Sequence, residues 1–265
     1  MKVVMYLAIC AAAATLLVAP AMATTLLSYQ MDEGSGSAVA DSSGNARNAV
    51  MSADLAAQSG NWVAGHSGTA VHFEQAVSKN TMINWYGASD WSNAMLLGDS
   101  TEFTVDTWIK PSGFAADEYL FAIGDGIGST VSIRWDPSLT ANATSLNKLT
   151  VYTYSGGHMD STISLSSPIQ AGVWQQLTLV YRETGESTAR YEIYKNGIEI
   201  GRSDLAYQID SNPNELHIGQ VPTGVWYRSY RGDVDEFSIS VVPEPITLSI
   251  LGLGGLFLAR RSNRS

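Results

Sequence analysis

Residues 24–241 are predicted to form an all-β domain, an antiparallel β-sandwich of two sheets. Apolar and polar side chains alternate with a period of two through much of this segment, and no long run has the 3.6-residue period of a helix. Asn196-Gly197 separates two alternating runs, and both residues of a type I′ hairpin turn need a positive φ. Short runs rich in Thr, Tyr, Val and Trp recur between turn residues, which is typical of sandwiches.

Five segments carry the clearest strand patterns. They are residues 103–109, 121–133, 149–154, 176–181 and 191–200. We expect the second to be two strands around a glycine-rich turn, and the last to be the Asn-Gly hairpin. No proline-rich or charged linker divides the segment, so we expect one domain. Trp108 and Trp174 lie in or beside such runs, and we expect both in the core.

Residues 1–23 have the composition of a secretory signal peptide, which consists of a cation, an apolar core and a small-x-small ending. Lys2 supplies the cation, residues 3–18 the core, and Ala21-Met22-Ala23 the ending. We therefore expect cleavage after Ala23. An uncleaved membrane anchor is the alternative, but it needs about 20 apolar residues.

Residues 242–265 form a second distinct segment. Its apolar run, residues 246–258, would rise only about 20 Å as a helix, against about 30 Å for a hydrocarbon core. Cationic residues follow the run at once and favour the cytoplasmic side. The order of V-P-E-P, short apolar helix and basic end resembles the PEP-CTERM sorting signal of Gram-negative bacteria. The motif residues are Val242, Pro243, Glu244, Pro245, Arg260 and Arg261.

This resemblance implies that the chain is secreted, that an exosortase recognises and processes it, and that it contacts the membrane only transiently. It also implies delivery to the cell surface, the outer membrane or an extracellular matrix. A plain tail anchor, in which the segment is retained, is the alternative.

The composition of the exported segment narrows the classes of function. Its precursor has one cysteine, Cys10, which lies in the signal peptide, so disulfides, thiol catalysis and Cys-ligated zinc are excluded. Without the two end segments, the chain carries 11 basic and 24 acidic side chains, a net charge of −13. This charge disfavours nucleic acid and anionic lipid as partners. It is compatible with neutral glycans, cationic partners or divalent cations.

The order of the strand motifs resembles laminin-G-like (LamG) and other concanavalin A-like jelly rolls. The similarity begins with L-S-Y-Q-M-D-E-G-S-G at residues 27–36 and V-A-D-S-S-G-N at 39–45. The later motifs are F-T-V-D-T-W-I-K-P at 103–111, W-Q-Q-L-T-L-V-Y at 174–181, Y-K-N-G at 194–197, L-H-I-G at 216–219 and G-D-V-D-E-F-S-I at 232–239. The resemblance spans nearly the whole segment between the two ends. It implies two packed antiparallel sheets with a concave face.

No arrangement of residues indicates catalysis. Asp233 and Asp235 are expected on one face of a strand and Glu236 on the other, whereas concanavalin-like glucanases have E-x-D-x-x-E. The histidines have no metal-ligand spacing, and no G-x-S-x-G elbow is present. These histidines are His66, His72, His158 and His217. We expect a protein without catalytic residues, and a glycoside hydrolase or lyase is the less favoured alternative.

A structural calcium ion (Ca2+) is a candidate cofactor. Asp41 and Asn45 offer oxygen ligands on one tight turn, and hard cations prefer such ligands. Many domains of the resembled fold have a calcium ion that joins the first turn to the last strand, which implies Asp235 as a third ligand. A simple Asx turn at Asp41 is the alternative.

Two aromatic groups are candidate ligand-binding residues, because exposed aromatic faces stack on sugar rings. They are Trp85, Tyr86 and Trp91 in a long Ser/Asn/Gly-containing stretch, and Trp226, Tyr227 and Tyr230 in the last long loop. Core packing is the alternative for each. We expect a surface or matrix module that binds carbohydrate or protein through rim loops or the concave face. A non-binding structural protein of an exopolysaccharide matrix is the alternative.

Overall fold

The computed structural model describes residues 23–74, 81–86, 101–124, 129–135, 138, 143–154, 158–209, 215–220 and 229–241. The predicted signal peptide, except Ala23, and the predicted sorting tail lie outside these residues. Thr25–Val241 form one compact unit, as expected for a single domain. In the part of the chain that is described, no helix is long and apolar enough to span a membrane.

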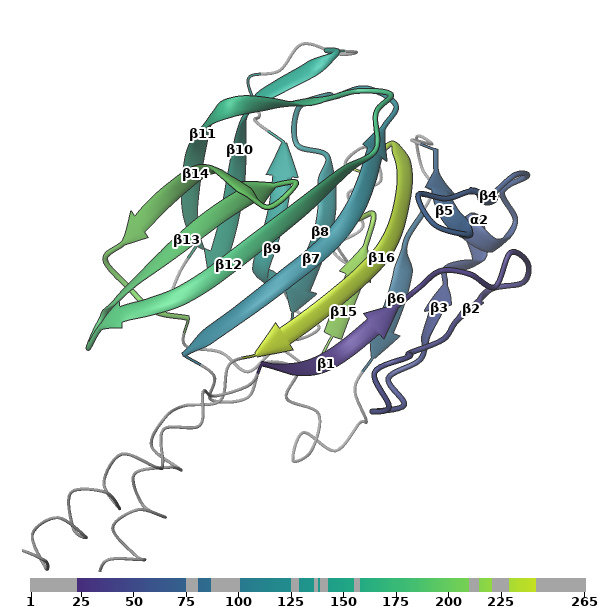
Figure 1. The fold of residues 1–265 in the computed structure, drawn as a ribbon, viewed down its shortest axis with the longest axis horizontal. Helices are drawn as coiled ribbons and strands as arrows, with labels where there is room; N and C mark the ends of the chain where they lie inside the picture. Colours follow the sequence, from purple (N-terminus) through teal and green to yellow (C-terminus); the bar gives the residue numbers. More distant parts are fainter. Residues whose placement is uncertain are drawn as a thin grey trace, which may run out of the picture. The chain divides into compact units, whose positions relative to one another are not determined.

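The described strands form two antiparallel sheets (Figure 1). In spatial order, sheet A contains β14 (Ile198–Leu205), β13 (Thr188–Lys195), β12 (Gln175–Gly185), β7 (Glu102–Pro111), β16 (Gly232–Val241), β5 (Thr69–Phe73) and β4 (Trp62–Ala64). Strand β1 (Thr24–Tyr29) also pairs with β16. Because β7 and β16 are adjacent in space but far apart in the chain, long connections must cross between the sheets.

Sheet B packs against sheet A through the hydrophobic core. In spatial order it contains β11 (His158–Gln170), β10 (Ser145–Tyr154), β9 (Ser129–Trp135), β8 (Tyr119–Gly124), β15 (Glu215–Ile218), β6 (Ile83–Tyr86), β3 (Ala49–Met51) and β2 (Ala38–Val39). A short helix, α2 (Ala53–Ala56), follows β3. The predicted two-sheet antiparallel sandwich is therefore confirmed.

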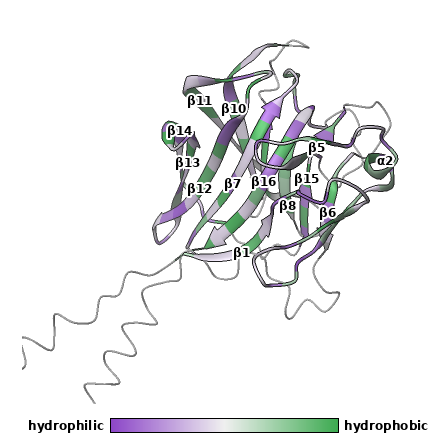
Figure 2. Ribbon diagram, turned by 45° about the vertical axis from the view of Figure 1, so that its right-hand side comes forward, coloured by the Kyte–Doolittle hydropathy of each residue, from purple (hydrophilic) through white to green (hydrophobic). Residues whose placement is uncertain are grey.

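The local signals in the sequence correspond to these strands. Buried and partly exposed residues alternate along the whole of β7, and Figure 2 shows the same alternation of hydrophobic and hydrophilic residues along β12 and β16. Asn196 and Gly197 have φ values of 51° and 77°, which confirms the predicted hairpin turn between β13 and β14. The glycine-rich segment predicted as two strands overlaps most of β8 and most of β9.

Aromatic side chains join the two sheets and the neighbouring strands of each. Phe121 of β8 meets Phe237 of β16 edge-on, with ring centroids 5.7 Å apart. Phe103 of β7 stacks on Tyr181 of β12 at 5.0 Å. All four are at most 1% exposed. Burying each such side chain contributes about 1.5–3 kcal/mol to stability, and the Phe121–Phe237 contact is one of those that join the two sheets.

Trp108 and Trp174 do not belong to this core, and the expectation that they do is wrong. On β7 the buried positions are Val105, Thr107 and Ile109, so the alternation of the strand directs Trp108 to the outer face of sheet A. Trp174 lies just before β12 and is partly exposed. The outer face of sheet A therefore carries aromatic side chains that the core does not use.

Candidate functional site

Asp41, the first predicted calcium ligand, closes the first turn of the domain with hydrogen bonds. Its Oδ1 accepts the backbone N–H groups of Ser28 and Ser43, both at 2.9 Å. Its Oδ2 accepts the N–H of Arg47 at 2.9 Å and the hydroxyl of Ser43 at 2.8 Å. Although partial burial opposes the change, these bonds lower the pKa of Asp41. The bond from the Ser43 N–H is the Asx turn that the sequence offered as the alternative.

The other two predicted ligands also have protein partners. Asn45 donates its Nδ2 to two backbone carbonyls of β1. Asp235 accepts the N–H groups of His66 and Ser67 through Oδ2 and that of Glu236 through Oδ1. Within the described ranges, no group of three or more His, Cys, Asp or Glu side chains could hold a metal ion. As placed, these residues fit hydrogen-bonded turns better than the expected cation site, and we do not propose calcium here.

Two of the six aromatic candidates are core residues. Tyr230 is fully buried and donates its hydroxyl to the carbonyl of Asp233 at 3.2 Å. Trp85 is 8% exposed, and the guanidinium of Arg47 lies over its ring, 5.6 Å from the centroid. The expectation that these two rings present a free face to a ligand is wrong for that reason. Four other aromatic positions lie outside the described part, namely the side chain of Tyr86 and residues Trp91, Trp226 and Tyr227.

Three charged side chains meet on the outer face of sheet A, and we refer to His72, Lys110 and Asp233 as the His72 cluster. The strand register sets Asp233 of β16 beside His72 of β5 and Lys110 of β7. Nδ1 of His72 lies 2.5 Å from Oδ1 of Asp233, and Lys110 donates its Nζ to Oδ2 at 3.2 Å. The sequence separation between His72 and Asp233 is 161 residues.

The cluster holds its carboxylate in the charged form. The hydrogen bond to Asp233 raises the pKa of His72, in spite of burial. Although burial opposes the change, the bonds from His72 and Lys110 lower the pKa of Asp233. The cluster therefore combines a carboxylate acceptor, Asp233, with two donors, Lys110 and His72.

Aromatic rings lie beside the His72 cluster on the same face. The ring of His66 stacks on Trp108 with centroids 3.5 Å apart, and it meets Trp174 edge-on at 6.3 Å. Nζ of Lys110 lies 5.8 Å from the ring centroid of Trp174, within range of a cation–π interaction. Asp235 fixes His66 through the backbone bonds described above, and burial raises the pKa of Asp235 to about 6.

A cavity of about 450 Å³ opens at the His72 cluster. Its other lining residues are Val63, Ala64, Pro111, Ser112 and Gly172. This volume is within the usual range for small-molecule sites, about 300–1,000 Å³. Lys110 and protonated His72 can donate hydrogen bonds, and Asp233 can accept them. The cavity can therefore bind a polar ligand that carries hydroxyl groups.

The carboxylates of this face are not arranged as a catalytic pair. A glycosidase needs two carboxyl groups on either side of the scissile bond, of which one donates a proton. Asp233 is held charged by two cationic partners, and Asp235 is fully buried with its oxygens bonded to backbone N–H groups. Among the described residues, this face is equipped for binding rather than for acid catalysis.

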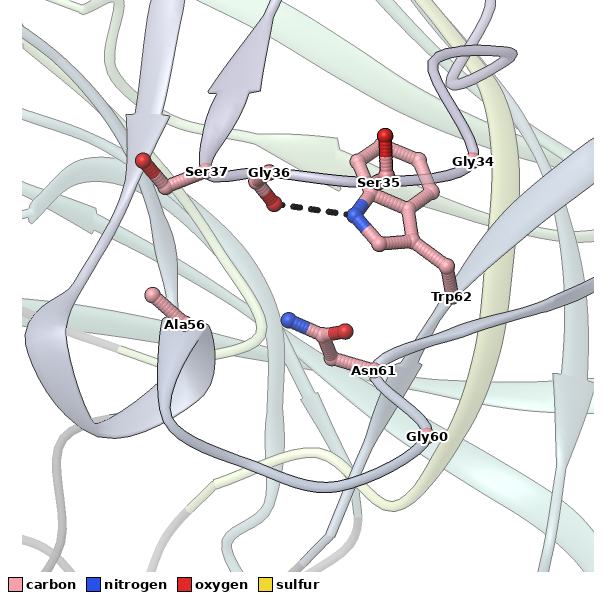
Figure 3. A pocket seen from close by; sticks show the side chains of 8 residues that line it. All are labelled: Gly34, Ser35, Gly36, Ser37, Ala56, Gly60, Asn61 and Trp62. Carbon is pink, nitrogen blue, oxygen red and sulfur yellow. Dashed lines mark hydrogen bonds between the residues drawn. The ribbon is translucent and has the colours of Figure 1, made fainter.

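A second cavity, of about 560 Å³, lies beyond the N-terminal end of β4 (Figure 3). Trp62 and Asn61 form one side of it, and Ala56 of α2 lies opposite, as Figure 3 shows. The remaining lining residues are Gly34, Ser35, Gly36, Ser37 and Gly60. Trp62 donates its indole Nε1 to the carbonyl of Gly36 at 2.9 Å. No side chain in this lining is charged.

The sequence did not single out His72, Lys110 or Trp62 as binding residues. The alternation of the strand at residues 103–109 does contain a signal for the outer face, because Trp108 and Lys110 fall between the buried positions. No such signal relates His72 to Asp233, since their approach depends on the register of β5 against β16.

Comparisons with known proteins agree with both resemblances. A family model described as the concanavalin A-like lectin/glucanases superfamily matches residues 86–242, which is more than half of the chain. A model of the PEP-CTERM protein-sorting motif matches residues 241–265. A search of curated proteins gave no match.

Solved structures with this fold include binding domains. Domain 4 of AbnA, a GH43 extracellular arabinanase from Geobacillus stearothermophilus solved with arabinotriose, is 18% identical, with a TM-score of 0.54 over 86% of this chain and 98% of that chain. The binding domain of Paraclostridial Mosquitocidal Protein 1 is 16% identical, with a TM-score of 0.55 over 86% and 51% of the two chains. The binding domain of a botulinum neurotoxin of serotype D/C is 13% identical, with a TM-score of 0.54 over the same shares. At these identities the likeness shows the fold alone.

Proposed function

The chain belongs to the concanavalin A-like lectin/glucanases superfamily and carries a PEP-CTERM sorting motif, and we propose that it is an exported binding module. The motif indicates export and sorting to the cell surface of a Gram-negative bacterium. We further propose that an exosortase processes the chain at this motif and that the domain then remains at the outer surface or in an exopolysaccharide matrix.

The cavity at the His72 cluster is the observation that carries the binding proposal. It brings an anionic acceptor, Asp233, and two donors, Lys110 and His72, to one opening on a sheet face. Sugars present several hydroxyl groups, each of which both donates and accepts, so this set of side chains suits a glycan. The domain's net charge of −13 favours neutral over polyanionic glycans.

Similar structures support a binding role without identifying the ligand. One is domain 4 of an arabinanase, solved with arabinotriose, and two are binding domains of toxins. Our proposal that the chain is not an enzyme rests on these neighbours and on the carboxylates of β16, whose oxygens already accept hydrogen bonds from other groups of the protein.

One observation favours the alternative of a structural matrix protein. Among the described residues, the large hydrophobic side chains that are well exposed are Val50, Val173 and Ile198, and none is aromatic. A lectin usually exposes an aromatic face to its sugar. Trp174 is only partly exposed, and His66 covers one face of Trp108.

A glycan array tests the proposed function. The full-length protein is applied to neutral and acidic glycans, with and without a calcium chelator, beside the variant Lys110→Met. We expect binding to at least one neutral glycan by the wild type and at least tenfold weaker binding by the variant. Lys148→Met, a change of an exposed lysine on sheet B, is the matched control and should bind as the wild type does. If the wild type binds none of the glycans, the proposal is contradicted. The alternative of a structural matrix protein would then be favoured.

A further inference from the structure

We propose that the cavity bordered by Trp62 is a second ligand site and that it takes an uncharged sugar ring. The residues of this site lie between positions 34 and 62, outside the segment that the superfamily model matches. The choice of a sugar as the ligand rests on the proposed function, whereas the site itself is separate from the His72 cluster.

The indole of Trp62 is held in place before any ligand arrives. Its Nε1 donates to the carbonyl of Gly36 at 2.9 Å, which ties β4 to the loop before β2 (Figure 3). Trp62 is only partly buried, so the ring still borders open space. A fixed aromatic ring loses little conformational entropy on binding, and its face suits the C–H groups of a sugar.

The wall opposite the indole is also fixed. Asn61 donates its Nδ2 to the carbonyl of Leu55 at 3.1 Å, which ties β4 to helix α2. The N–H of Leu55 is bonded in turn to the side chain of Ser52, the N-cap of α2. Hydrogen bonds within the protein therefore hold both walls of the cavity in position.

Glycine keeps this cavity open. Gly36 and Gly60 have φ values of 80° and 75°, a region that other residues rarely adopt. A Cβ atom at either position would meet no other atom within 4 Å, so it would project into open space. The backbone conformation at both positions therefore favours glycine, and neither residue adds a side chain to the lining.

The lining selects against charged ligands. All eight lining residues are uncharged, whereas the segment between the two ends carries a net charge of −13. An anion would meet an unfavourable field and no positive partner in the lining. Ser35 and Ser37 are among the lining residues, and serine carries a hydroxyl group that can both donate and accept hydrogen bonds.

Filling the cavity from α2 tests this site. Ala56 lines the cavity and is exposed, so Ala56→Trp should occupy it without disturbing the core. Ala53 lies on the same helix, is also exposed and does not line the cavity, so Ala53→Trp is the matched control. The probes are arabinotriose, xylotriose, cellotriose and maltotriose, titrated into the full-length protein by calorimetry and by NMR of the indole N–H groups.

We expect one of these neutral trisaccharides to shift the indole N–H resonance of Trp62 in the wild type and in Ala53→Trp. In Ala56→Trp that shift should be lost, and the affinity for this site should fall at least tenfold. An unchanged Trp62 resonance with every probe would overturn the second site. If the probes still bind and Lys110→Met abolishes that binding, the proposed function stands without the second site. If no probe binds at all, the second site is overturned, whereas the proposed function fails only if the glycan array is also negative.

Discussion

Asp233 is the residue on which the His72 cluster depends, since its two oxygens accept from two different cationic side chains. Each of these partners comes from a neighbouring strand, so the contacts also join β5 and β7 to β16. Hydrogen bonds to charged groups contribute about 1.5–3 kcal/mol when they are well formed. The cluster therefore has a structural effect that can be measured apart from ligand binding.

Asp233→Asn should destabilise the domain by about 1–3 kcal/mol at pH 6, and by less at pH 8. The raised pKa of His72 means that its contribution is fully present below the ordinary value of 6.5. That contribution is lost as the pH rises through the pKa of the folded state. Urea unfolding at both pH values measures the difference. Asp204→Asn, at an exposed ion pair with Arg190, is the control and should cost less than about 1 kcal/mol at either pH.

Glu118 is a buried acid, and its contribution to stability depends on pH in the same direction as that of His72. Burial raises its pKa from 4.5 to about 7, although the N–H of Ala115 and the guanidinium of Arg231 both donate to it. The folded state thus holds this proton more tightly than the unfolded state does. Its effect is to lower the free energy of unfolding as the pH rises from about 4.5 through 7.

Glu118→Gln should flatten this part of the pH dependence. The measurement is the free energy of unfolding at pH 5 and pH 8 for the wild type and the variant. The fall between the two pH values should be smaller in Glu118→Gln than in the wild type. Glu186→Gln, at an exposed position, should keep the wild-type fall. An equal fall in the free energy of unfolding in Glu118→Gln and in the wild type would show that Glu118 does not cause it.

At the scale of single elements, β7 shows what a strand pattern can and cannot predict. The alternation of residues 103–109 predicts both the strand and its two faces. We expect Trp108 in the core because it lies in a strand-like run, but the alternation of the strand places it on the outer face. Burial of Tyr230 and the pairing of His72 with Asp233 depend on contacts between distant segments, and no local pattern contains them.

The β13–β14 hairpin is an element whose turn the sequence predicts completely. Gly197→Ala should cost about 1–2 kcal/mol, because φ of 77° is unfavourable for a residue with a Cβ atom. Chemical unfolding measures the loss. Ile198→Ala, next to it and 71% exposed, should change stability by less than about 0.5 kcal/mol. A similar loss in both variants would contradict the role of the turn.

At the scale of the whole molecule, residues 24–241 are an acidic, cysteine-free sandwich, which a PEP-CTERM sorting motif follows in the sequence. Its order of motifs was sufficient to predict the fold, because each short motif marks one strand and the series occurs in family order. The binding site could not be predicted in the same way. The His72 cavity is lined by side chains from β4, β5, β7 and β16, and it exists only after these strands have paired.

Chelation tests whether calcium contributes to the stability of the molecule. The carboxylate of Asp41 already accepts four hydrogen bonds, so we expect the Tm of the full-length protein to be the same with and without a chelator. A fall of several degrees on chelation, reversed by added calcium, would contradict this expectation. If such a fall occurs, the same measurement on Asp41→Asn shows where calcium binds. The fall should be lost in this variant if calcium binds at this turn, and kept if it binds elsewhere.

The central claim is that the His72 cavity is where the domain binds its ligand. NMR chemical-shift mapping with a glycan identified on the array tests it most directly. We expect the largest backbone shifts on His72, Lys110, Ser112, Gly172 and Asp233, and we expect Lys110→Met to abolish them. Saturable shifts that spare all five of these residues would contradict it.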